Sequence, residues 1–408
     1  MLHALPVAAD VGTFTLTDRT EVRVRGPDPV TNAAALVLDT AADARATLAS
    51  PHSLYTLAYQ PRLTLLDMNG GPAFSPGLLN GWLASAGWTT GHALIELHET
   101  GGYGAYAFAS LGTIPAPGTA VETNPGGQPT TVANTQLVPG VQTYTVLSSN
   151  TSASSTLTLK PWLVTGIVGY QLSGGADAPS RLFIPFGQGP YAQAIADLRA
   201  GRRDHLVTVG NALESSFVPI DTEVVLLEVQ EQWRHAWTRN TDTMLAGGIS
   251  EARTRDAADA PYEYATDGVA EGKIEQRFGR GKNVGAIDLD VRLAPVVNQL
   301  LGLVDERVQA SLLASWTHRK VTLRASATAA ESLDQSSPLA AKILTGEVDA
   351  EYSPNLALSF DVGARVLAED QSYAATSATG VIGPVTETTF NQGVVFFAVT
   401  VRAVKTRF

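Results

Sequence analysis

Charged side chains recur at every second position in several segments of this sequence. In the segment 356–366, Asp361 and Arg365 alternate with apolar residues such as Phe360 and Val362. Successive side chains of a strand point to opposite faces, so this spacing gathers charge on one face and leaves the other apolar. Such a face can attract ions and orient polar solutes. The residues that we assign to it are Glu228, Arg234, Glu271, Lys273, Glu275, Arg277, Asp288, Asp290, Arg292, Arg307, Arg324, Glu347, Asp349, Glu351, Asp361 and Arg365.

Two roles are open for these charges. They can line a polar conduit, or they can pair across neighbouring strands and stabilise a wall, which for any single residue is the favoured interpretation. A turn at 279–282 predicts that Lys273 lies opposite Asp288 and that Glu271 lies opposite Asp290. Because like charges repel across a strand pair, the second pair should recruit a cation or an arginine from the facing wall. The candidate arginines are Arg324 and Arg365.

Catalytic and metal-binding constellations are not evident. The chain has no cysteine and seven histidines, at positions 3, 52, 92, 98, 205, 235 and 318. His92 and His98 share one face of one expected strand, but at about 3.3 Å per residue they lie roughly 20 Å apart, too far to bind one metal ion. We therefore predict no enzyme activity, no metal site and no cofactor.

The elements that must carry the charged face are strands of about ten residues, and they fit either a soluble sandwich or a transmembrane β-barrel. Short connections such as 317–320 alternate with long ones such as 369–390, as in barrels with tight periplasmic turns and long external loops. The apolar face is rich in Ala, Gly and Val, which suits lipid better than a packed core. Aromatic residues next to short turns predict an interfacial girdle of Trp162, Phe278, Trp316 and Tyr352. These features favour the barrel.

The barrel should have about eighteen strands, an even number as bacterial single-chain barrels have. Sixteen is the alternative, because the segment 33–46 is rich in Ala and could form a helix. The predicted strands are 12–25, 34–48, 54–67, 78–88, 92–103, 142–158, 162–172, 190–199, 204–214, 222–237, 241–253, 264–278, 283–293, 307–317, 320–330, 343–352, 356–368 and 391–408.

One barrel should fill residues 12–408, preceded by a short lead-in over 1–11. The lead-in has no basic stretch followed by an apolar one, so we expect that an export signal is missing from this chain. The longest external loop should be 104–141. The net charge of −11 disfavours nucleic acid as a partner.

The final segment, Gly393 to Phe408, is an amphipathic strand that ends in an aromatic residue. With the strand pattern before it, the chain resembles Gram-negative outer-membrane β-barrel proteins of the porin type. That resemblance implies a location in the outer membrane, insertion by the barrel-assembly machinery through Phe408, and contact with the lipid bilayer and lipopolysaccharide. Segments such as 55–63 also look like the exopolysaccharide-export barrels of myxobacteria-like organisms, which implies outward passage of polysaccharide and a periplasmic export partner.

Two functions stay open. The first is a channel for hydrophilic solutes, with polysaccharide export as its finer form. The second is a structural or adhesin-like barrel with a narrow or blocked lumen, which anchors a surface complex through its external loops. The width of the lumen separates the two.

Overall fold

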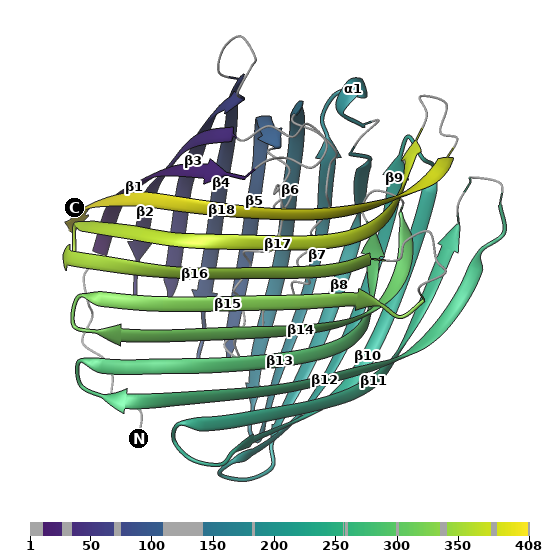
Figure 1. Ribbon diagram of the computed structural model, residues 1–408. Coiled ribbons are helices and arrows are strands. Elements are labelled where there is room, and N and C mark those ends of the chain that lie inside the picture. The colour runs from purple at the N-terminus through teal and green to yellow at the C-terminus, as the bar shows by residue number, and fades with distance from the viewer. Residues whose placement is uncertain are drawn as a thin grey trace.

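The alternating segments fold as antiparallel strands that join into one closed sheet (Figure 1). The computed structural model describes residues 11–26, 35–68, 75–108, 142–181, 184–255, 257, 260–298, 302–334, 341–376 and 382–406. Strands that are neighbours in sequence pair with each other, and β1 also pairs with β18, where Thr13 lies opposite Thr406. The predicted eighteen-stranded up-and-down β-barrel is therefore confirmed. Closure gives partners to backbone groups that a sheet edge would leave unpaired.

The strands are β1 (Val11–Arg25), β2 (Ala35–Ala49), β3 (Ser53–Met68), β4 (Ser75–Thr89), β5 (Ala93–Phe108), β6 (Gln142–Leu159), β7 (Trp162–Gly175), β8 (Phe186–Arg199), β9 (Asp204–Val218), β10 (Thr222–Ala236), β11 (Thr241–Arg255), β12 (Glu263–Arg280), β13 (Asn283–Asn298), β14 (Leu303–His318), β15 (Val321–Ser332), β16 (Ala341–Asn355), β17 (Leu358–Thr376) and β18 (Ile382–Thr406). A four-residue helix, α1 (Ala178–Arg181), follows β7. Within the described part of the chain, no helix is long and apolar enough to span a membrane.

Most strand ends at the short turns agree with the sequence prediction, whereas several strands extend further at the opposite end. β2 occupies the Ala-rich segment for which a helix was the alternative. β13 continues to Asn298, and β17 and β18 extend toward each other to Thr376 and Ile382. A hairpin can continue its hydrogen-bond ladder into water without an apolar face. The extensions therefore leave no apolar alternation in the sequence, and the prediction ended these strands too early.

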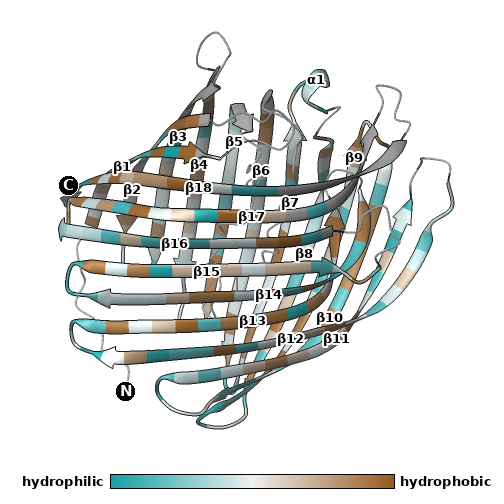
Figure 2. Cartoon of the chain, viewed as in Figure 1, coloured by the Kyte–Doolittle hydropathy of each residue, from teal (hydrophilic) through white to brown (hydrophobic). Residues whose placement is uncertain are grey.

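The two faces of the sheet differ in character, as the alternating colours along the strands of Figure 2 show. On the apolar face, Val362 is 52% exposed and Leu312 is 42% exposed. An exposed belt of this kind suits contact with lipid chains. The four aromatic residues of the predicted girdle lie on the same face beside the short turns, between 40% and 47% exposed: Trp162, Phe278, Trp316 and Tyr352.

Several short turns differ from the prediction: between β14 and β15, the connection is 319–320 and not 317–320. Two further turns change how their strands meet. β12 and β13 are joined by the two residues Gly281 and Lys282, so Arg280 pairs with Asn283 and the register moves by two residues. Gly281 has a φ of 64°, which allows this tight turn. Between β16 and β17 the turn consists of residues 356–357. The predicted turn 353–355 instead forms the end of β16, where the register is irregular after Tyr352. Phe408 and positions 109–141 of the predicted long loop lie outside the described residues.

Candidate functional site

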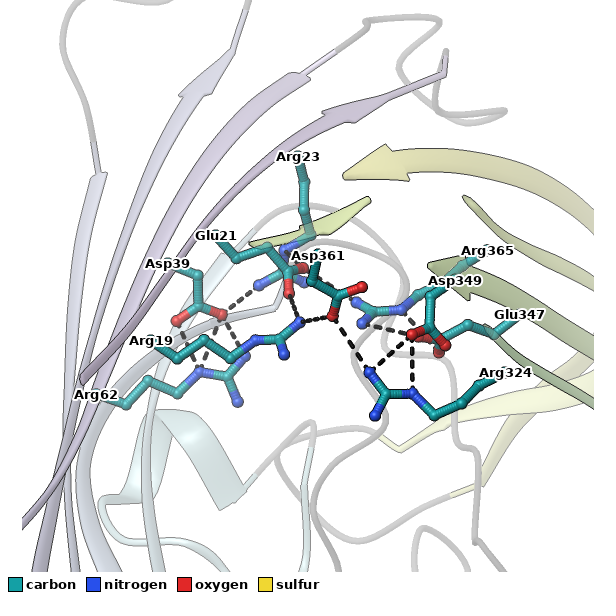
Figure 3. A network of polar contacts seen from close by, with 10 residues as sticks. All are labelled: Arg19, Glu21, Arg23, Asp39, Arg62, Arg324, Glu347, Asp349, Asp361 and Arg365. Carbon is teal, nitrogen blue, oxygen red and sulfur yellow. Dashed lines mark hydrogen bonds and ion pairs between the residues drawn. The ribbon is translucent and has the colours of Figure 1, made fainter. Parts of the chain in front are cut away.

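A network of ten charged side chains, five arginines and five acids, joins the strands on both sides of the barrel closure (Figure 3). The charged network lines a cavity of about 480 Å³. Its residues come from β1, β2, β3, β15, β16 and β17 and point toward one another in the view of Figure 3. The members are Arg19, Glu21, Arg23, Asp39, Arg62, Arg324, Glu347, Asp349, Asp361 and Arg365.

The strand β18 lies between β17 and β1 and carries an alanine and an aromatic side chain beneath the charged network. This leaves room for long charged side chains to meet above β18. Asp361 on β17 lies opposite Ala398, and Ala398 lies opposite Glu21 on β1. Ala398 is fully buried. Long side chains of β17 and β1 therefore meet over it: Arg365 donates to Glu21 at 3.2 Å, and Arg19 donates to Asp361 at 3.1 Å.

Glu21 and Asp39 are the acceptors of the β1–β3 half of the charged network. Glu21 forms ion pairs with Arg19 at 3.0 Å and with Arg23 at 3.1 Å. Asp39 pairs with Arg23, and Arg62 Nε donates to Asp39 Oδ1 at 2.9 Å. Both acids are more than nine-tenths buried. Two or three arginines around each carboxylate compensate for its lost hydration.

The β15–β17 half contains the sequence-predicted members. Arg324 lies 2.8 Å from Asp349, 3.0 Å from Glu351 and 3.7 Å from Asp361. Arg365 donates to Glu347 at 2.9 Å. The Arg365 guanidinium carbon also lies 4.3 Å from the centre of the Phe396 ring, a cation–π distance. The six predicted residues of these strands are thus in one group: Arg324, Glu347, Asp349, Glu351, Asp361 and Arg365.

A second group of predicted charges lies on β10, β12 and β13. Arg292 is 3.3 Å from Glu228, although β11 and β12 separate their strands. Asn211 on β9 donates to Glu228 at 3.2 Å, and Gln193 on β8 donates to Asn211 at 2.8 Å. A polar chain therefore continues from β8 to β13.

The predicted strand pairs in this group need correction. Lys273 lies opposite Asp290, not Asp288, and Glu271 lies opposite Arg292, not Asp290. The two-residue turn after Arg280 causes this shift. Lys273 still contacts Asp288 diagonally at 2.9 Å. The arginine beside Glu271 thus comes from the neighbouring strand, whereas Arg324 and Arg365 belong to the charged network.

The remaining predicted residues have local partners. Arg277 pairs with Glu275 at 2.6 Å, and Arg234 donates to Gln232 at 2.9 Å. Arg307 pairs with Asp305 at 2.5 Å near the far end of β14. In the described part of the chain, no group of three or more His, Asp or Glu residues could hold a metal ion.

Sequence reasoning missed the five members of the charged network on β1, β2 and β3. The sequence 13–23 does indicate a polar face, because Arg19, Glu21 and Arg23 fall at odd positions, as do three threonines before them. Asp18 falls at an even position, on the largely apolar face, and so makes the alternation harder to recognise. An apolar cluster was also missed: Phe217, Val224 and Val297 pack together and join the ends of β9 and β10 to that of β13.

Fold and charge distribution together define a class, the outer-membrane β-barrels. The model of the EpsX exopolysaccharide export family matches residues 5–378. The chain belongs to this family. No curated protein sequence matches it.

Solved structures show overall similarity at low identity. OccK7 (OpdD) of Pseudomonas aeruginosa is 9% identical, with 97% of this chain and 99% of that chain covered and a TM-score of 0.46. OpdK of the same organism gives the same four values. A bacterial polysaccharide outer membrane secretin is 12% identical, covers 95% of this chain and 98% of that chain, and has a TM-score of 0.35.

Proposed function

We propose that this chain is an outer-membrane channel for hydrophilic solutes and that it passes a polysaccharide outward. The observation that carries the proposal is the polar face of the barrel wall, in a chain that belongs to an exopolysaccharide export family. In this proposal, the sixteen charged residues predicted from the sequence line the lumen, together with the five network residues of β1–β3.

Neutral polar side chains support a sugar as the solute. Between the two charged groups, the same face carries amides and hydroxyls that include Asn150, Ser152, Thr165, Gln193 and Asn211. Tyr191 donates to Asn150 at 2.7 Å, which orients that amide. Amides and hydroxyls both donate and accept hydrogen bonds, so they can replace the water around sugar hydroxyls as a chain moves.

The polymer would come from the periplasm, so we infer a periplasmic export partner at the rim of short turns. We also infer insertion by the barrel-assembly machinery and an outer leaflet of lipopolysaccharide around the barrel. The aromatic residues beside the turns would then lie at the periplasmic boundary of the outer membrane.

A second candidate function is the anchor of a surface complex with a narrow lumen. Two contacts favour it. The ion pair of Glu228 and Arg292 joins strands that are not neighbours, and the cluster around Phe217 joins two parts of the rim. In this second proposal, both contacts narrow the space that the strands enclose.

Conductance separates the candidates. Purified protein in planar bilayers should give stepwise ionic currents, and exopolysaccharide of the source organism should block them. A strain without the protein should retain the polymer inside the cell. Bilayers that contain folded protein but carry no current, together with normal secretion in the deletion strain, would refute the channel and favour the anchor.

A further inference from the structure

The apolar face of the barrel has a groove that extends from β5 to β12. The groove has a volume of about 830 Å³ and opens on the outer side of the wall. Its floor contains Gly166, Ala194 and Gly210, and its sides include Val229 and Ile249. These five residues form one row across the strands, in which Gly166 lies opposite Ala194, Ala194 opposite Gly210, Gly210 opposite Val229, and Val229 opposite Ile249.

The described residues do not fill this groove. A Cβ atom added to Gly166 or Gly210 would meet no heavy atom within 4 Å. Elsewhere on the same face, the ring of Phe278 lies so close to Gly285 that an added Cβ would meet it at 2.3 Å. Ile249 at the side of the groove is 65% exposed. The groove is thus an apolar hollow at the level where a membrane barrel faces lipid chains.

Basic residues lie at the turns below the same strands. Lys160, Arg202 and Arg239 are exposed in the turns that join β6 to β7, β8 to β9 and β10 to β11. The turns are contiguous, because the Arg199 amide donates to the Pro161 carbonyl at 3.3 Å and the Arg203 side chain donates to the Trp237 carbonyl at 3.2 Å.

The described structure gives these basic residues no acidic partner. Among the described residues, none forms an ion pair with Lys160, Arg202 or Arg239. The chain as a whole carries a net charge of −11, so a local excess of positive charge does not follow from its composition. A site with this surplus attracts an anion.

Exposed tryptophans lie between the basic turns and the groove. Trp162 begins β7 and is 42% exposed, and Trp237 is the first residue of the turn after β10 and is 53% exposed. Tryptophan favours the level of lipid headgroups. The order from the turns inward is therefore positive charge, aromatic ring and apolar hollow, which matches the phosphate, glycerol region and acyl chain of a phospholipid.

We propose that this surface binds an anionic phospholipid of the periplasmic leaflet, with an acyl chain in the groove and its headgroup at Lys160, Arg202 and Arg239. A second copy of the chain fits less well. A two-fold axis along the membrane normal would bring the same basic turns together, and like charges would oppose that contact. The proposal goes beyond the channel function and does not depend on which solute is passed.

Filling the groove tests the acyl-chain part. The test uses purified protein in detergent, an equal mixture of phosphatidylglycerol and phosphatidylethanolamine, and native mass spectrometry of the retained lipid. Gly166→Leu and Gly210→Leu should each reduce retained phosphatidylglycerol about tenfold, because loss of two buried methylenes is worth roughly that factor. Gly393→Leu is the matched control, because Gly393 lies on the apolar face of β18, outside the groove, and its added Cβ also meets nothing within 4 Å.

Neutralising the turns tests the headgroup part, and these exposed positions leave the wall of the barrel untouched. The combined variant Lys160→Gln, Arg202→Gln, Arg239→Gln should lose the preference for phosphatidylglycerol over phosphatidylethanolamine. The control is the triple variant Arg280→Gln, Lys282→Gln, Lys320→Gln, which removes three basic residues at other turns. It should keep the preference for phosphatidylglycerol. Equal retention of phosphatidylglycerol in the groove variants and in Gly393→Leu would overturn the proposal. So would dimers that crosslink through Gly210→Cys, because a second copy would then occupy the groove.

Discussion

Arg292 on β13 reaches Glu228 on β10 at 3.3 Å across two intervening strands. Glu228 is only 4% exposed, and Asn211 donates a further hydrogen bond to it. Arg292→Met would leave this buried carboxylate without its positive partner. We expect a loss of about 2–4 kcal/mol in the free energy of unfolding, because an unpaired buried charge is costly. Urea unfolding of the barrel in lipid vesicles measures it.

The double variant Glu228→Gln, Arg292→Met is the control for that contact. Removal of both charges should restore most of the lost stability, since the penalty comes from the isolated carboxylate. If the two single substitutions are additive in the double variant, the side chains are not energetically coupled and the contact does not hold β10 to β13.

The balance of the charged network should set the ion selectivity of a channel. Arg365 contacts Glu21 and Glu347, so Arg365→Gln leaves an excess of negative charge beside the cavity. Asp349→Asn has the opposite effect, because Asp349 pairs with Arg324. In bilayers under a potassium chloride gradient, the reversal potential should move toward cation selectivity in the first variant and toward anion selectivity in the second. Shifts of the same sign would show that the network does not line the ion path.

The sequence predicts the strands and their faces well because a period of two is a local property. One side chain in two must meet lipid, so the apolar alternation of 356–366 or 307–317 identifies both the strand and its outer face. Strand ends away from the short turns are less predictable. There the hairpins continue in water, as in β17 beyond residue 368, and the apolar signal disappears while the backbone ladder continues.

The partners of individual charges could not be predicted, because they depend on closure and on turn geometry. Arg365 meets Glu21 only because the first and last strands are joined and Ala398 between them is small. The register of β12 and β13 depends on a two-residue turn at Gly281, which the Gly-rich sequence around it does not specify uniquely. Alternation gives the face of a residue, whereas the contact requires the three-dimensional wall.

Contact of the apolar face with lipid can be tested at Val362, which lies mid-strand on β17 and is 52% exposed. Val362→Arg should destabilise the barrel in a bilayer, lowering its free energy of unfolding by about 2–4 kcal/mol, as expected for an arginine near the midplane. The matched control is Leu356→Arg, because Leu356 is 95% exposed in a short turn and the charge there should cost about 0–1 kcal/mol. Equal effects at the two positions would contradict contact between this face and lipid.

Orientation can be tested with single cysteines, because the chain contains none of its own. Leu356 lies in the short turn between β16 and β17, and Ala257 is exposed in the connection between β11 and β12 at the opposite end of the strands. Short turns of outer-membrane barrels face the periplasm, so Ala257→Cys should react with a membrane-impermeant maleimide on whole cells. Leu356→Cys should react only after the outer membrane is permeabilised. Labelling of Leu356→Cys on intact cells would reverse the topology and would place the basic turns, and the proposed phospholipid site, in the lipopolysaccharide leaflet.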